Sequence, residues 1–256
     1  MKTMVDFYRF EHLERFSGCM HAVTMKDTSA PFSLSLALHT GEEKEQIAVN
    51  RKMIAESFGV SREWCFVVAD QTHSDNIHIV TKKETRGWES QESAVADCDA
   101  LITDQKGVVL CVLTADCVPV LLYDPEEEVA AAVHAGWKGT KSKIVAKTVR
   151  KMQEVFGCSA ENIVAGIAPA IGKCCYEVGE EVAQHFFDLR EAFTTRGDKY
   201  MLDLSFVNKQ QLLDSGLQKE NIKMSGICTA CEVERYFSYR KEQGCSGRFM
   251  SMIALL

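Results

Sequence analysis

The chain has 256 residues, 46% of them apolar and 25% charged, which is the composition of an ordinary soluble globular protein. Its net charge of −7 argues against nucleic acid or an anionic membrane as the main partner. The N-terminus lacks the apolar stretch of a signal peptide, and the most apolar segment, 108–123, is too short to span a bilayer. We therefore expect a cytoplasmic protein, a monomer or weak dimer, whose eleven cysteines stay reduced.

The first readable element is a helix over residues 43–58, where Ile47, Arg51, Ile54 and Phe58 fall on one stripe. Arg51 lies in the middle of this apolar face, and a guanidinium is rarely placed there without an anionic partner. A structural salt bridge and a ligand-binding role both remain open for Arg51.

Three strands follow, over residues 108–113, 117–123 and 129–134, and the first reads as buried on both faces. Residues 124–128 carry a turn signal. A two-residue loop centred on Pro125 and Glu126 would place Cys117 opposite His134, close enough to share a metal or a proton. A four-residue loop would instead pair Cys117 with Gly136.

A second helix is predicted over residues 141–156, with Thr140 or Ser142 as its cap and Gly157 as its end. Its buried stripe comprises Val145, Val149, Met152 and Phe156. The entry, residues 136–140, offers backbone N–H groups beside Lys138, and such a helix start can hold an oxyanion or phosphate. No repeat or linker interrupts the alternation of helix-like and strand-like segments. We therefore predict a single domain, residues 1–256, of α/β or mixed α+β class.

Seven short motifs come in a specific order: QTHS at 71–74, TADCVP at 114–119, VHAGWKGT at 133–140, GIAPAIG at 166–172, YEV at 176–178, FSYR at 237–240 and GR at 247–248. Together they resemble the polyphenol-oxidase or laccase-domain family, reinterpreted as multifunctional purine nucleoside enzymes. The resemblance covers roughly residues 20 to 255. It implies a layered sandwich with a central mixed sheet, similar to the cysteine-dependent deamidating toxins. Residues 24–27 and 33–37 depart from the family's Arg-Gly-Gly turn and Ser-x-Asn-Leu-Gly segment.

The same resemblance implies that His73, Cys117 and His134 bind one metal ion, zinc by expectation and copper as an alternative. Two imidazoles and a thiolate leave a fourth tetrahedral position open, as in catalytic zinc sites. Family members are described as phosphorolysing purine nucleosides and methylthioadenosine and as deaminating adenosine, so purine nucleosides and phosphate are the implied partners. The candidates for anion binding are Arg51, Lys138 and Arg248. We rank Arg51 first and predict that it points into the pocket beside the metal.

A second group of cysteines comprises Cys174, Cys175, Cys228 and Cys231. Zinc ribbons usually combine two CxxC pairs, and the vicinal pair here makes a four-cysteine site awkward. Cys228 matches a Cys-Thr step near the family's site, so we expect it to line the pocket.

Three other functions are weighed against this hypothesis. A multicopper laccase needs several His-x-His pairs, whereas this chain has seven histidines and no such pair. A thiol hydrolase would use Cys117 as nucleophile and His134 as base. A non-catalytic metal-binding or regulatory protein would keep the metal ligands alone.

Overall fold

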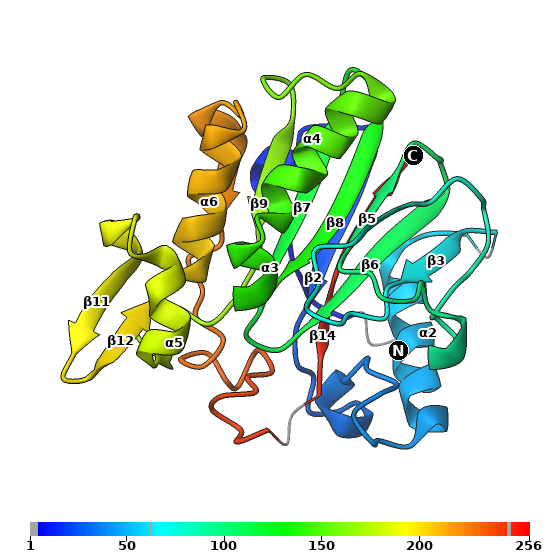
Figure 1. Ribbon diagram of the computed structural model, residues 1–256. Coiled ribbons are helices and arrows are strands. Elements are labelled where there is room, and N and C mark those ends of the chain that lie inside the picture. The colour runs from blue at the N-terminus through cyan, green and yellow to red at the C-terminus, as the bar shows by residue number, and fades with distance from the viewer. Residues whose placement is uncertain (1–4, 62, 245–246) are drawn as a thin grey trace.

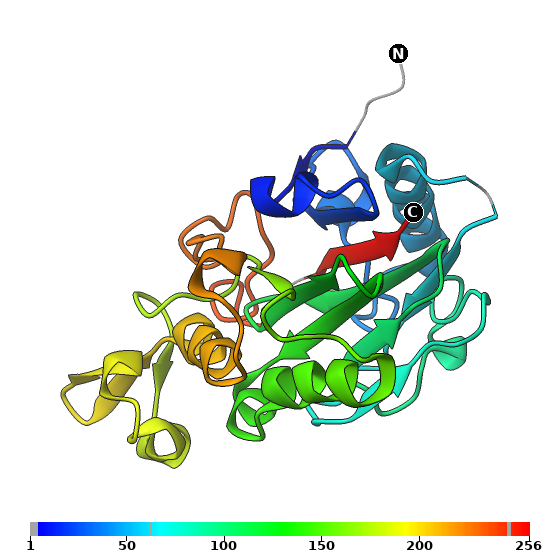
Figure 2. The same cartoon turned by 90° about the horizontal axis from the view of Figure 1, so that it is seen from above.

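The computed structural model describes residues 5–61, 63–244 and 247–256. Two mixed β-sheets face each other at its centre (Figures 1 and 2). The five-stranded sheet has the order β1 (Phe7–Tyr8), β2 (Cys19–Thr24), β14 (Phe249–Leu255), β6 (Val108–Thr114) and β3 (Cys65–Val68). The six-stranded sheet has the order β13 (Ile222–Met224), β9 (Val164–Ile167), β7 (Val118–Asp124), β8 (Val129–Ala135), β5 (Ala100–Thr103) and β4 (Ile77–Ile79). A small third sheet contains β10 (Glu177–Val178), β12 (Lys199–Leu202) and β11 (Phe193–Arg196).

Helices cover the outer faces of the two large sheets. The α-helices are α1 (Glu11–Glu14), α2 (Lys44–Phe58), α3 (Trp137–Lys141), α4 (Ile144–Phe156), α5 (Glu180–Ala183) and α6 (Leu204–Asp214). Short 3-10 helices occupy Pro31–Leu34, Gln91–Ser93, Gln184–Phe186, Arg190–Ala192 and Lys219–Asn221. Helices α4 and α6 pack on the six-stranded sheet, and α2 packs on the five-stranded sheet (Figure 1). None of the helices in the described part of the chain is long and apolar enough to cross a membrane.

The sequence of strand β6 is apolar over residues 108–113 because both faces of the strand are buried. Val108, Leu110 and Val112 pack between the two sheets, whereas Val109 and Cys111 belong to the core beneath α2. Alternate residues therefore enter different cores, as predicted for a strand buried on both faces. The predicted layered α/β architecture is confirmed, with two facing mixed sheets at its centre.

The two predicted helices are also confirmed, as α2 and α4. The stripe of α2 is buried as expected, and Gly59 and Gly157 end the two helices in left-handed conformation. The expected cap of the second helix is wrong. Residues 137–141 form the separate helix α3, and Lys143, with a φ of 60°, stands at the N-cap of α4 without a side-chain cap.

The β7–β8 hairpin has the four-residue loop, so the two-residue register is wrong. Asp124 pairs with Val129 and Pro119 lies opposite His134. The Asp124 carboxylate accepts hydrogen bonds from the backbone N–H groups of Glu126 and Glu127, which stabilises the longer turn. A shift of two residues keeps every side chain on its original face of the sheet, because the side-chain period of a strand is two. Cys117 therefore stays on the face of His134, as its diagonal neighbour.

The chain passes from the five-stranded sheet to the six-stranded sheet twice, both times at the same end. β3 and β6 are parallel neighbours, and residues 69–76 and 115–117 lead from their ends to β4 and β7. Both crossing segments carry residues of the motifs singled out above. They place the candidate site at the end of the two sheets where β3 and β6 end.

Candidate metal centre and cavity

The side chains of His73, Cys117 and His134 converge, as predicted. Their ligand atoms all lie within 4.8 Å of one another. Cys117 Sγ is 3.7 Å from His73 Nε2, and the two imidazole rings are 4.9 Å apart between centroids. His73 and Cys117 come from the two crossing segments, and His134 comes from the end of β8.

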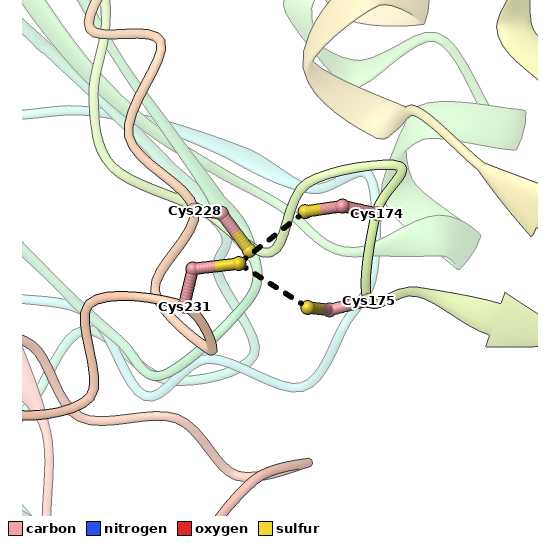
Figure 3. A group of neighbouring side chains, drawn as sticks. All are labelled: Cys174, Cys175, Cys228 and Cys231. Carbon is pink, nitrogen blue, oxygen red and sulfur yellow. Dashed lines mark hydrogen bonds between the residues drawn. The ribbon is translucent and has the colours of Figure 1, made fainter.

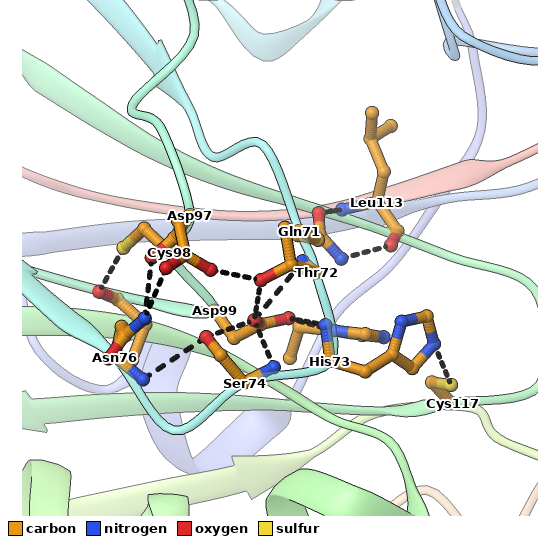
Figure 4. A network of polar contacts seen from close by, with 12 residues as sticks. Gln71, Thr72, His73, Ser74, Asn76, Asp97, Cys98, Asp99, Leu113 and Cys117 are labelled. Atoms are coloured by element: carbon orange, nitrogen blue, oxygen red, sulfur yellow. Dashed lines mark hydrogen bonds and ion pairs between the residues drawn. The ribbon is translucent and has the colours of Figure 1, made fainter.

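Asp99, a fully buried carboxylate just before β5, holds two of these residues in place (Figure 4). Its Oδ1 lies 2.7 Å from His134 Nδ1, which leaves Nε2 of that ring as the metal-binding atom. The same carboxylate accepts hydrogen bonds from the backbone N–H groups of Thr72, His73 and Ser74 and from the Ser74 hydroxyl. Burial alone would raise the pKa of Asp99, but the bonds from His134 and Ser74 outweigh it and hold that pKa below its usual value.

Asp99 is not among the site residues predicted from the sequence. The available signal was an acidic residue directly before a fully buried strand, where an unpaired carboxylate would be costly. Nothing in the spacing connected that carboxylate to residues 72–74 or to His134, because the connection forms only through the fold.

The cluster favours a thiolate and an imidazolium when no metal is bound. Burial would raise the pKa of Cys117, but the adjacent His134 and His73 lower it to about 6. Burial would lower the pKa of His134, but Cys117 and Asp99 raise it to about 9. The site thus stabilises the deprotonated sulfur that a metal ion requires.

Gly136 leaves space for two of the three side chains, those of His73 and Cys117. A Cβ atom at this position would lie 2.8 Å from His73 Cδ2 and 3.1 Å from Cys117 Sγ. The residue opposite Cys117 in the hairpin must therefore lack a side chain. Two nitrogens and one sulfur at these distances suit a small tetrahedral ion such as zinc, with one position left for a fourth ligand.

The free side of the cluster faces a cavity of about 520 Å³. Aromatic and charged side chains surround it: His39, Asp70, Trp137, Tyr176, Tyr239, Arg240 and Arg248. The Arg240 guanidinium lies over the Tyr176 ring and that of Arg248 over the Tyr239 ring, at 5.3 and 5.7 Å from the centroids. This combination suits a flat, partly apolar ligand that carries an anionic group.

Arg248 is the predicted anion-binding residue that the structure places at the cavity. The segment that departs from the family pattern supports it: the Arg248 N–H donates to Ser35 Oγ, and the Leu36 N–H donates to the Arg248 carbonyl. Arg240, which is not among the predicted anion-binding residues, lines the same cavity as Arg248. Lys138 is exposed and does not line this cavity. Its neighbour Trp137 does.

The predicted orientation of Arg51 is wrong. Arg51 is 1% exposed, and its guanidinium donates to the backbone carbonyls of Leu36, Gly87 and Trp88, at 2.5 to 2.9 Å. Burial lowers its pKa to about 10. Carbonyl oxygens thus take the place of the anionic partner expected for a guanidinium on an apolar helix face. Arg51 joins helix α2 to two loops and does not line the cavity.

Cys228 does not line the cavity either, contrary to expectation. Its sulfur lies instead in a second cluster with Cys174, Cys175 and Cys231, and the Gly172 N–H donates to it at 3.2 Å. Within the described residues, these are the two groups whose donor atoms are close enough to hold one metal ion.

The two-sheet fold and the His–Cys–His cluster beside a cavity define a laccase-like class of protein. The family model described as multi-copper polyphenol oxidoreductase laccase matches residues 20–256, and the chain belongs to this family. It is 36% identical over 233 residues to purine nucleoside phosphorylase YlmD of Bacillus subtilis, covering 88% of this chain and 83% of that one. It is 32% identical to adenosine deaminase RL5 of an unknown prokaryotic organism, over 95% of both chains. The crystal structure of the Bacillus licheniformis hypothetical protein YfiH superposes with a TM-score of 0.92 at 34% identity, covering 99% and 97% of the two chains.

Proposed function

We propose that this protein is a zinc-dependent purine nucleoside phosphorylase that also deaminates adenosine. The observation that carries the proposal is the open side of the His73–Cys117–His134 cluster, which faces a cavity with both aromatic rings and arginines. The names of the relatives, purine nucleoside phosphorylase and adenosine deaminase, support the same class of substrate. Adenosine, inosine, guanosine and methylthioadenosine are the expected nucleosides.

In phosphorolysis, the bond between the purine nitrogen and ribose C1′ breaks and a bond from a phosphate oxygen to C1′ forms. Arg240 and Arg248 are the residues that would hold the phosphate, since both carry their charge at the cavity. Tyr176 and Tyr239 would hold the flat base by stacking. Zinc would supply Lewis acidity, by polarising a substrate oxygen or by lowering the pKa of a water molecule to about 7.

Asp99 is a positioning residue in this proposal. By accepting hydrogen bonds from His134 and from the backbone of residues 72–74, it fixes the direction of two metal ligands. Such partners orient the imidazole and raise its basicity.

A nucleoside screen on protein of known metal content tests the function. We expect close to one zinc at this cluster and release of free base from inosine or adenosine that requires phosphate, with ribose 1-phosphate as second product. Inosine formed from adenosine without phosphate would establish the deaminase activity. A protein that holds zinc at the cluster but turns over none of these nucleosides would contradict the proposal.

A thiol hydrolase remains the second candidate, because Cys117 and His134 are adjacent and Asp99 orients the imidazole. This arrangement also suits a nucleophile and its base. Metal removal separates the two. A zinc enzyme loses activity with a chelator and recovers it with zinc, whereas a thiol enzyme gains activity when the metal is removed.

A further inference from the structure

A second group of potential metal ligands, drawn in Figure 3, does not line the cavity. The sulfurs of Cys174, Cys175, Cys228 and Cys231 are all within 4.8 Å of one another. The Cys231 sulfur is 3.5 Å from those of both Cys174 and Cys175. The two contributing segments are more than fifty residues apart in sequence, so the fold brings them together.

Each pair of cysteines is presented by a turn. The N–H groups of Cys175 and Tyr176 both donate to the Gly172 carbonyl, which curls the chain so that the adjacent sulfurs reach one partner. In the other segment, the Glu232 N–H donates to the Cys228 carbonyl and closes a turn over the CxxC sequence. The vicinal pair therefore does not prevent a four-cysteine site, contrary to the expectation from sequence.

The spacing matches one tetrahedral ion. With Zn–S bonds of about 2.3 Å, the sulfurs of a tetrahedral site are about 3.8 Å apart, close to the 3.5 Å contacts and below the 4.8 Å limit found here. A cluster of several irons would hold its thiolates further apart.

The surrounding backbone is also built for this cluster. The Gly172 N–H donates to Cys228 Sγ at 3.2 Å, a contact that stabilises a thiolate. A Cβ atom on Gly172 would lie 3.2 Å from Cys228 Cβ and 3.4 Å from Cys174 Sγ. The glycine thus leaves room for the sulfurs to surround an ion.

We propose that Cys174, Cys175, Cys228 and Cys231 bind a second zinc ion in a closed four-thiolate site. This site does not depend on the proposed enzymatic function. Its zinc would join the turn that precedes the cavity residue Tyr176 to the segment of Thr229, whose hydroxyl donates to Asp116 at the cavity wall. All four ligand positions are filled by protein, so the ion is structural and supports the cavity without contacting the substrate.

Zinc counts in matched variants test the proposal. Protein purified without added metal should contain two zinc ions per chain, Cys231→Ser one, and Cys117→Ala one. Cys65→Ser is the control: its thiol lies at the start of β3, outside both clusters, and this variant should keep two. One zinc in the unmodified protein, together with one in Cys231→Ser and none in Cys117→Ala, overturns the second site and leaves the first intact.

Cobalt substitution gives an answer even if Cys231→Ser does not fold. Cys117→Ala loaded with Co²⁺ has no thiolate at the first site, so the intense sulfur-to-cobalt absorption of a four-thiolate ion would report on the four cysteines. We expect an intense band that zinc removes, and protection of all four thiols from alkylation until a chelator is added. Absence of the band overturns the proposal. So does an intact mass two hydrogens lower than the reduced chain, with alkylation of the four thiols only after a reductant, because a disulfide would then occupy the cluster.

Discussion

The two ligand clusters of this protein differ in what surrounds them. The His73–Cys117–His134 cluster supplies three donors, is oriented by a buried carboxylate and opens onto a cavity of about 520 Å³. The four-cysteine cluster supplies four donors from two turns and does not line that cavity. The same fold thus provides one group of three donors, which would leave the fourth position of a tetrahedral ion open, and another group of four thiols, which would fill all four positions. Catalytic zinc sites have the first arrangement, and structural zinc sites have the second.

The largest expected effect concerns the open cluster. Cys117→Ala removes one of three ligands, so nucleoside turnover should fall to background and one zinc equivalent should be lost. The melting temperature should fall only by the contribution of the lost zinc, because the strands β7 and β8 keep their packing. Measurement of base release, zinc content and thermal unfolding on the same preparation checks this, with Cys65→Ser as the thiol control. Full turnover by Cys117→Ala would show that the open cluster is not the catalytic centre.

The next effect separates the cluster that Asp99 orients from the four-cysteine cluster. Asp99→Asn should reduce zinc affinity or activity by about 10- to 100-fold, because the neutral amide no longer fixes the His134 tautomer. Asp97→Asn is the matched control, since Asp97 contacts Thr72 and Asn76 but no imidazole. Zinc in the four-cysteine cluster should be unaffected by either change. Equal losses in both variants would assign Asp99 a role in loop folding only.

A smaller effect is expected for Arg248, the proposed phosphate-binding residue at the cavity beside the open cluster. Arg248→Met should raise the KM for phosphate by about tenfold, which corresponds to the loss of one charge-assisted hydrogen bond. Phosphate-independent deamination should change less. Steady-state kinetics at varied phosphate decides, and an unchanged KM would assign phosphate binding to Arg240 or to the metal.

Arg51 is a cation that does not line the cavity, so Arg51→Met should affect stability and not phosphate binding. The substitution leaves three backbone carbonyls without their donor, each at a cost of about 1–3 kcal/mol. The melting temperature should fall by about 10 °C for a chain of this size, while the KM for phosphate stays as it was. Kinetics below the transition and a thermal melt test this together. A raised KM without lower stability would restore Arg51 as a ligand-binding residue.

Arg51 and Arg248 show what could be predicted from the sequence. The period of α2 correctly placed Arg51 on a buried stripe, because burial follows directly from helix geometry. Its partners could not be predicted, because they are backbone carbonyls of loops, and every residue type offers the same carbonyl. The predicted proximity of Cys117 and His134 was correct although the predicted strand register was wrong. The register differed by two residues, so both side chains stayed on the same face of the sheet. The contacts of Asp99 and of the four cysteines depend on crossings between segments far apart in sequence, which local patterns do not encode.

The smallest predicted effect is a difference in thiol ionisation between the two clusters in metal-free protein. The neighbouring imidazoles lower the pKa of Cys117 to about 6 against the opposing effect of burial, whereas burial and the adjacent Cys231 raise that of Cys175 to about 11. The thiolate is the reactive form, so alkylation of Cys117 by iodoacetamide should rise as the pH increases through about 6 and be level between pH 7 and 8. Over the same interval an ordinary thiol with a pKa near 8.5 still gains reactivity almost in proportion to hydroxide, and Cys175 should remain slow.

Alkylation resolved by peptide mass after chelator treatment measures both residues in one sample, and zinc added beforehand should protect Cys117. If Cys117 instead titrates like an ordinary thiol, His134 does not stabilise its thiolate, and the dyad required by a thiol hydrolase is absent. Since zinc can displace the thiol proton at a higher pKa as well, that outcome would leave the metal enzyme as the remaining candidate for the open cluster.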